Sequence, residues 1–205
     1  MLFEDTYHTI QSAAASEVRE RGSRFLGLSY PVKSEEEVKA LLQKVKKEHP
    51  QANHHCYAFR LTTDPTVFRF SDDREPSGSA GKPILGAIQS KGLTDILIVV
   101  VRYFGGTLLG VPGLISAYRS AAAQVIEQST IIEQTINDSF VLTFPYELIN
   151  EVHHLLKFFP LQIKKQDYSQ PCTIIFDIRK KFSPDFEKKF KEHPKLSYQS
   201  TLEPI

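Results

Sequence analysis

Carboxylates, small residues and a lysine gather in one polar stretch, "SDDREPSGSAGKP", which spans residues 71–83. Asp72, Asp73 and Glu75 are close enough in sequence to hold a hard cation such as magnesium, or to supply an acid and a base. The small residues that follow leave backbone amides open, and amides at the start of a helix attract anions. The stretch therefore has two interpretations. It is either a cradle for phosphate or another anion, or a loop capped by its own side chains with a solvated acidic edge.

The spacing in this stretch is not that of a P-loop, because the pattern G-x-x-x-x-G-K-[ST] fails at both ends. The candidate ligand-binding residues here are Asp72, Asp73, Arg74, Glu75, Ser77, Gly78, Ser79, Gly81 and Lys82.

A second polar segment, "RYFGGTLLGVPG" at residues 102–113, holds four of the ten glycines and follows the apolar run "DILIVVV". A strand, a glycine turn and a helix start together form a good anion site. The alternative is a tight crossover in which glycine lets strand and helix pack closely. The spacing is not the dinucleotide pattern G-x-G-x-x-G. The candidate residues are Arg102, Tyr103, Gly105, Gly106, Gly110, Gly113 and Arg119.

Two further groups are weaker candidates. His54 and His55 are adjacent in a predicted strand and point to opposite faces, so we predict no metal site and no cofactor there. Basic residues near aromatic ones in the last third of the chain could bind single-stranded RNA, but we favour the interpretation that they are solvated surface lysines. These secondary nucleic-acid candidates are Lys164, Lys165, Arg179, Lys180 and Lys181.

The elements that must position these residues follow from hydrophobic periodicity and turn signals. In the first part of the chain we expect a hairpin around Arg21-Gly22, a helix over 34–50, strands at 54–61 and 66–71, a short helix ending near Gly92, a buried strand at 95–101, and a long helix through 126. Residues 131–138 are predicted to bridge to a second unit. That unit has the order β-α-β-β-α-β, which is the ferredoxin-like arrangement. The prediction is an α+β chain with two domains, residues 1–134 and 135–205.

Composition excludes several classes. Of the 205 residues 41% are hydrophobic and 24% are charged, an ordinary globular balance, and a net charge of +1 gives no global basic field. The start "MLFEDTYHTI" lacks a basic region and an apolar core, so it is not a secretory signal. No apolar run is long enough to span a bilayer. Two isolated cysteines are typical of a reducing compartment, so we expect a cytoplasmic protein without membrane association.

Four blocks of sequence resemble the IMPACT family, most closely its two-domain bacterial members of the YigZ type. They are "RGSRFLG", "ANHHCYAFRL", "SDDREPSGSAGKPIL" and "VVVRYFGGTLLGVPGLISAY". The resemblance implies an N-terminal α/β domain similar to domain IV of elongation factor G and a ferredoxin-like C-terminal domain. It also implies translation regulation in eukaryotic members, and RNA or ribosome binding in bacterial ones.

The chain departs from the family pattern at two places. Arg74 stands where the family usually has glycine, which adds a cation to the first polar stretch. Pro112 and Ser116 replace a residue with an amide donor and an arginine, respectively, and both changes weaken an anion site at the second segment.

Three hypotheses follow. The first is a binding module for RNA, the ribosome or a translation-related protein. The second is a metal-dependent enzyme with hydrolase, peptidase-like or phosphoryl chemistry that uses Asp73, Glu75 and Lys82. The third is a protein-interaction adaptor that uses the same surface. We favour binding over catalysis and assign no catalytic residue, because no nucleophile, base and orienting group stand out together. We expect the two polar segments to form one concave surface; the oligomeric state stays open.

Overall fold

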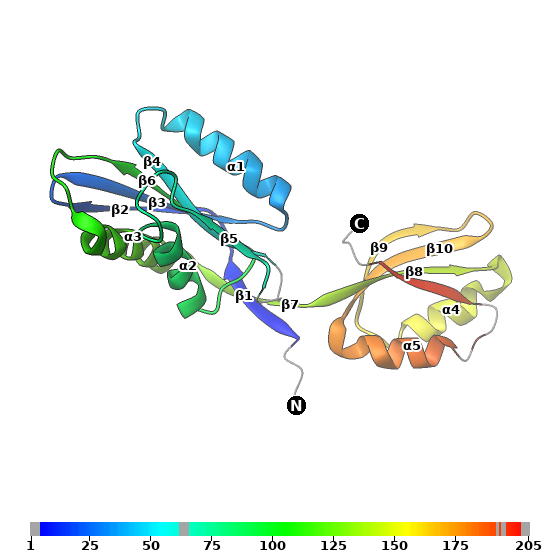
Figure 1. Ribbon diagram of the computed structural model, residues 1–205. Coiled ribbons are helices and arrows are strands. Elements are labelled where there is room, and N and C mark those ends of the chain that lie inside the picture. Colours follow the sequence, from blue (N-terminus) through cyan, green and yellow to red (C-terminus); the bar gives the residue numbers. More distant parts are fainter. Residues whose placement is uncertain (1–4, 62–65, 192, 194–195, 202–205) are drawn as a thin grey trace. The chain divides into compact units, whose positions relative to one another are not determined.

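The computed structural model describes residues 5–61, 66–191, 193 and 196–201 (Figure 1). Its contacts divide the chain into two compact units. One comprises Tyr7–Gln134, and the other comprises the chain from Thr135 onward together with Asp5 and Thr6. The mixed α+β architecture predicted from the sequence is confirmed.

The larger unit is built on a five-stranded sheet in which every neighbouring pair is antiparallel. Its strands lie in the order β2-β3-β6-β4-β5. Their bounds are β2 Ala14–Glu20, β3 Ser23–Pro31, β4 His54–Arg60, β5 Phe68–Ser71 and β6 Ile96–Tyr103. The predicted hairpin is present, since β2 and β3 pair from Ala14–Ser29 to Glu20–Ser23 around Arg21 and Gly22. β5 forms one edge of the sheet.

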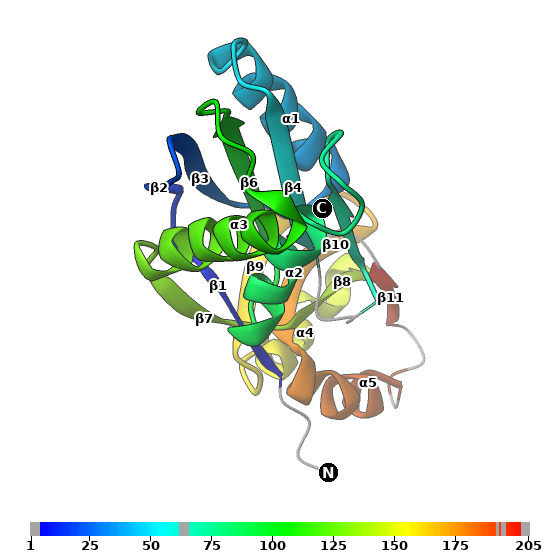
Figure 2. The same cartoon turned by 60° about the vertical axis from the view of Figure 1, so that its left-hand side comes forward.

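Helices cover both faces of this sheet, with α1 on one face and α2 and α3 on the other (Figures 1 and 2). Their bounds are α1 Glu35–Glu48, α2 Gly81–Ser90 and α3 Gly110–Glu127. The N-terminus of α1 forms because Ser34 accepts a hydrogen bond from the Glu37 amide, as the capping spacing predicts. α2 ends near Gly92, whose φ of 63° is the left-handed conformation expected after a helix.

The central strand β6 explains why the sheet has two cores. Ile96, Ile98 and Val100 pack with α2 and α3, whereas Leu97, Val99 and Val101 pack on the α1 side. Side chains alternate along a strand, so the next residue, Arg102, points to the α2–α3 side. The strand thereby carries a buried arginine toward the polar stretch at residues 72–80.

Residues 131–138 cross between the two units, as predicted, and they do so as strands. They form β7 Ile131–Thr135 and the start of β8 Asn137–Phe144. β7 pairs with β1 Thr6–Ile10, a strand that sequence periodicity missed. β1 and β7 lie about 125 residues apart in sequence, so no local sequence pattern predicts that they pair.

The second unit is a four-stranded sheet in the order β11-β8-β10-β9 with helices α4 and α5 on one face (Figure 1). The bounds are α4 Ile149–Leu156, β9 Leu161–Asp167, β10 Cys172–Arg179, α5 Ser183–Lys191 and β11 Ser197–Thr201. Its core includes Phe140, Phe176 and Phe186, whose rings contact one another. The predicted ferredoxin-like arrangement is confirmed.

No helix in the described part of the chain combines the length and apolar character that crossing a membrane requires.

Candidate functional site

The polar stretch at residues 72–80 is organised by the Asp72 carboxylate. Its Oδ1 accepts hydrogen bonds from the amides of Ala80 at 3.0 Å and Gly81 at 2.8 Å, and its Oδ2 accepts one from Gly78 at 2.8 Å. No residue of the first turn of α2 is acidic and its N-cap residue makes no side-chain bond, so Asp72 supplies the negative charge at this helix start. These three amides have an internal acceptor, as in the capped-loop interpretation.

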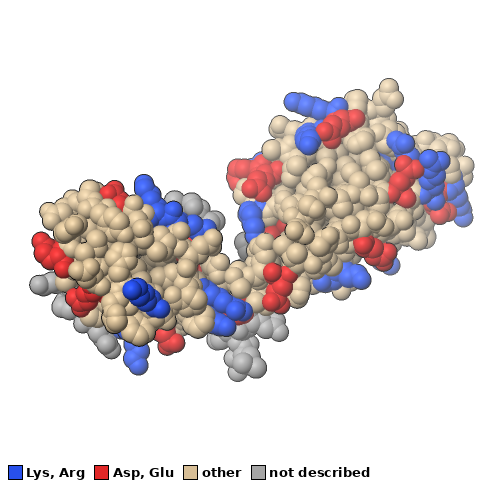
Figure 3. Space-filling model, turned by 180° about the vertical axis from the view of Figure 1, so that it is seen from behind, with Lys and Arg blue, Asp and Glu red and all other residues tan. Residues whose placement is uncertain are grey.

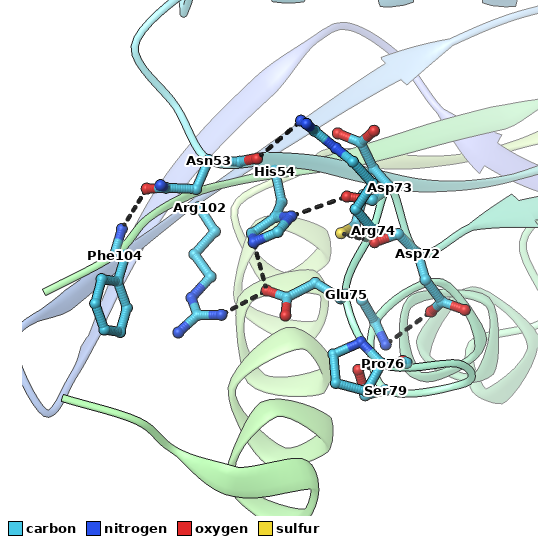
Figure 4. A network of polar contacts seen from close by, with 12 residues as sticks. Asn53, His54, Asp72, Asp73, Arg74, Glu75, Pro76, Ser79, Arg102 and Phe104 are labelled. Atoms are coloured by element: carbon cyan, nitrogen blue, oxygen red, sulfur yellow. Dashed lines mark hydrogen bonds and ion pairs between the residues drawn. The ribbon is translucent and has the colours of Figure 1, made fainter. Parts of the chain in front are cut away.

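Glu75 lies at the centre of a buried polar network (Figure 4). Its Oε1 accepts hydrogen bonds from Arg102 Nη1 at 2.6 Å and from the Tyr118 hydroxyl at 2.8 Å. The side chains of Arg102 and Glu75 are only 6% and 4% exposed. The guanidinium of Arg102 also lies over the rings of Phe25 and Phe104, 5.5 Å and 5.6 Å from their centroids. The network ties the end of β6 and α3 to the loop before α2.

Strand β4 adds two residues to this network. His54 Nε2 lies 3.7 Å from Glu75 Oε1, and its Nδ1 is hydrogen-bonded to the Asp73 carbonyl at 2.8 Å. Cys56 is fully buried and donates from its thiol to the Asp72 carbonyl at 3.0 Å. Burial raises the pKa of both the Cys56 thiol and the Tyr118 hydroxyl far above their ordinary values. Both groups are therefore neutral donors and poor nucleophiles.

Asp73 connects the loop to the α1 side of the sheet. Its Oδ2 accepts from the His55 amide at 2.7 Å. His55 Nε2 lies 3.1 Å from the His49 carbonyl oxygen, and His49 Nδ1 lies 2.8 Å from the Tyr103 hydroxyl. Burial lowers the pKa of His55, against the hydrogen bond to His49 and the charge of Asp73, which raise it. Tyr103, a predicted site residue, therefore lies on the opposite sheet face from Arg102.

Arg74 occupies a conformation that favours glycine. Its φ is 72°, and its guanidinium donates to the Asn53 carbonyl at 3.3 Å. The glycine that the family pattern has at this position is explained by the backbone, because residues with a Cβ rarely adopt positive φ.

The glycine segment after β6 is a tight crossover at Gly105. A Cβ on this residue would lie 1.9 Å from the carbonyl carbon of Gly22, so the two backbones are in direct contact. Gly106 and Gly110 have positive φ of 86° and 69°. Gly113 is closely packed, because a Cβ at this position would lie 3.1 Å from Cβ of Leu109. These residues shape the turn into α3.

An open groove of about 750 Å³ lies beside this network, with its lining drawn from β5, α2 and α3 and the loop before α2. It is lined by Phe68, Phe70, Gly78, Lys82, Pro83, Leu85, Gly86, Gln89, Ile115 and Arg119. Lys82 and Arg119 are exposed and form no ion pair with any residue that the structure describes. No carboxylate of the described residues lines the groove, so the charge of its described lining is positive. We call this the α2–β5 groove.

The sequence-predicted site residues thus divide into two groups. Gly78, Lys82 and Arg119 line the groove, whereas Asp72, Asp73, Glu75 and Arg102 hold the loop together beside it. Sequence reasoning missed Phe68 and Phe70, although their alternation around Arg69 in "TVFRFS" places both on one face of β5. It also missed the roles of Tyr118 and Asn53, for which no local signal exists.

Other predicted residues lie apart from the groove. Ser79 is buried and its hydroxyl donates to the Pro76 carbonyl at 2.6 Å, while Ser77 is exposed. In the second unit, Lys164 pairs with Asp177 at 3.1 Å and Arg179 pairs with Asp5 at 2.6 Å. Lys165 lies on β9, and Lys180 and Lys181 lie in the short turn of helix Lys180–Phe182. Their local positive charge is therefore partly neutralised.

Positive and negative side chains are interspersed over the face drawn in Figure 3. Within the described part of the chain, no cluster of three or more His, Cys, Asp and Glu side chains is arranged to hold a metal ion.

Comparison with known proteins places these features in a family. The model of the Impact N-terminal domain matches residues 21–126, which include the loop network and the groove. An IMPACT family member of Haemophilus influenzae is 36% identical over 191 residues, covering 91% of each chain. The IMPACT family member YigZ of Escherichia coli is 36% identical over 162 residues, covering 78% of this chain and 79% of its own.

Two solved structures are also similar to this chain. One, described as a crystal structure of a hypothetical protein, superposes with a TM-score of 0.74 at 29% identity and covers 98% of this chain and 99% of its own. Another is the two-domain translational regulator Yih1, 27% identical over 58% of this chain and 48% of its own, with a TM-score of 0.39.

Proposed function

This chain belongs to the IMPACT family, and we propose that it is an RNA- or ribosome-associated binding protein that acts in translation rather than an enzyme. Family membership supports the connection to translation, because the resemblance of the sequence blocks implies that role. The α2–β5 groove is the observation that carries RNA binding. It combines two cations, Lys82 and Arg119, with exposed aromatic side chains, and among the described residues no carboxylate lines it or pairs with either cation.

The chemistry of the groove suits an anionic polymer that has flat rings. Phosphates bind exposed Lys and Arg side chains, and nucleic-acid bases stack on aromatic rings. Two cations account for contacts with about two phosphates, so the expected affinity is modest and sensitive to salt. We place this binding in the cytoplasm, where ribosomes are found and where free cysteines such as Cys56 and Cys172 stay reduced.

Catalysis at the acidic loop is the weaker hypothesis. The Asp73 carboxylate accepts a hydrogen bond from the His55 amide, and the Glu75 carboxylate accepts hydrogen bonds from Arg102 and Tyr118. Carboxylates engaged in this way stabilise the loop and are not oriented toward a substrate. The raised pKa of Cys56 and of Tyr118 removes both as nucleophiles at neutral pH.

Fluorescence anisotropy with labelled RNA tests the proposal. We expect binding at low salt, with an affinity that falls by a slope of about −1.4 against log salt for two contacts to single-stranded phosphates. Lys82→Glu and Arg119→Glu should each weaken binding at least about tenfold. Lys91→Glu makes the same charge change just beyond the other end of α2, outside the groove, and should have little effect.

Sedimentation with ribosomes gives a second measurement. Absence of binding to RNA and to ribosomes at low salt would contradict the proposal. Ribosome association that persists in the Lys82→Glu, Arg119→Glu double variant would show that the contact is made outside the groove.

A further inference from the structure

Gly86 has no structural reason to be glycine. It lies in the interior of α2 on the exposed side of the helix, and a Cβ at this position would meet no atom of the described residues within 4 Å. Its φ is helical, so neither a turn nor a positive φ requires glycine. Glycine inside a helix lowers stability relative to alanine. The space that its missing side chain leaves opens into the α2–β5 groove.

Gly86 is flanked on its own helix by polar groups of the groove. Lys82, Gly86 and Gln89 have the spacing of one helix face, and all three line the groove. A ligand that lies along this face meets a cation, then bare backbone, then a side-chain amide. A flat group can pack directly against the exposed backbone at Gly86. A chain of phosphates would bind the Lys82 cation without needing that contact.

The aromatic side chains of β5 face the same groove. Phe68 and Phe70 are 37% and 42% exposed, high values for phenylalanine in a folded unit. They are two residues apart on an edge strand, which places their Cα atoms about 7 Å apart on one face. α2 contacts β5 directly, and Figures 1 and 2 both show them adjacent. The groove therefore combines aromatic rings from β5 with bare backbone from α2.

We propose that the α2–β5 groove binds single-stranded RNA through an unpaired base that packs against Phe68 and Phe70 and the bare backbone of Gly86. Lys82 and Arg119 bind the flanking phosphates. This proposal rests on the RNA-binding function proposed above and specifies its substrate class. Bases in a duplex are stacked on one another and its major groove is too narrow for side chains, so a duplex cannot reach these rings.

Two sets of variants test the base contact. Phe68→Ala and Phe70→Ala should each weaken binding of a single-stranded RNA of about 12 nucleotides by roughly 5- to 150-fold, the range of one lost base stack. Gly86→Ala and Gly86→Gln should weaken it progressively, while raising the midpoint of thermal unfolding because both residues favour helix more than glycine does. These opposite effects on binding and stability distinguish a ligand contact from a structural role.

Controls and probes separate this inference from the broader function. Ala40→Gln introduces a glutamine on the exposed face of α1, outside the groove, and should leave binding unchanged. A duplex of the same length should bind at least about tenfold more weakly than the single strand.

Equal affinity for duplex and single strand, or full binding by Gly86→Gln, would overturn this inference and leave RNA binding through Lys82 and Arg119 intact. Equal affinity for duplex and single strand, together with RNA binding that Lys82→Glu and Arg119→Glu leave unchanged, would overturn both this inference and the proposed RNA binding by the groove. Binding of an acidic peptide in place of RNA would likewise reject the RNA assignment of the groove.

Discussion

Arg102 and Glu75 form a buried ion pair in which Nη1 lies 2.6 Å from Oε1. Arg102 ends the central strand β6, and Glu75 belongs to the loop that precedes α2. The pair therefore connects the two polar segments that the sequence presents 27 residues apart. Tyr118 of α3 shares the same carboxylate oxygen, so three segments meet at one atom.

Replacing either partner of the Arg102–Glu75 pair should lower the stability of the protein. Glu75→Gln and Arg102→Met each leave a buried polar group without its charged partner, and each should lower the free energy of unfolding by about 3–5 kcal/mol. Urea denaturation followed by circular dichroism measures the loss, and hydrogen exchange of α3 peptides locates it in the larger unit. Arg19→Ala, which breaks the exposed pair with Glu17, is the control and should cost about 0–1 kcal/mol. Equal costs at the two pairs would show that the buried pair is not important for stability.

Asp72 should be a positioning residue for the groove. Asp72→Ala removes the acceptor of three amides, including that of the groove residue Gly78, and should cost about 1–3 kcal/mol. RNA affinity should fall with it, because Gly78 and Lys82 lose their fixed positions. Asp72→Asn retains one carbonyl acceptor, so its losses in urea denaturation and in RNA anisotropy should be smaller. If Asp72→Asn is as damaging as Asp72→Ala, charge rather than acceptor geometry determines the effect.

Gly105 and Gly106 should differ in how much stability is lost when each is replaced by alanine. Gly105→Ala places a Cβ against the Gly22 backbone and should cost more than about 2 kcal/mol. Gly106→Ala has open space and suffers only from its positive φ, which costs about 1 kcal/mol. Thermal unfolding of the two variants makes the comparison directly. The packing explanation fails if Gly106→Ala is the more destabilised of the two.

His55 should make stability depend on pH. Burial lowers its pKa in the folded state, so the folded protein holds the ring neutral while the unfolded chain takes up a proton near pH 6.5. Protonation therefore favours unfolding, and stability should fall as pH decreases from about 6.5 toward the lower folded-state pKa. The free energy of unfolding of His55→Gln, measured across this window, should fall less steeply than that of the wild type. His8→Gln, which removes an exposed histidine, is the control. Parallel slopes for wild type and His55→Gln would contradict the prediction.

The sequence by itself determined the elements and the fold class. The alternation in "CTIIFDIR" and the apolar run of β6 predict strands, and the spacing of Ser34 and Glu37 predicts the start of a helix. These predictions hold because each signal lies within a few neighbouring residues. Family blocks located the loop and the glycine segment. The bridge at residues 131–138 does cross between the two units, but β1 and its pairing with β7 were missed because that pairing is long-range.

Only the tertiary structure decided what the polar residues do. The sequence predicts one concave surface from all of them, but the fold turns Asp72, Glu75 and Arg102 inward and leaves Lys82 and Arg119 facing solvent. Phe68, Phe70 and Gly86 join those cations because β5, α2 and α3 pack side by side. Which face a side chain presents is local information, but what lies opposite that face depends on contacts between distant segments, and these form only when the sheet and helices assemble.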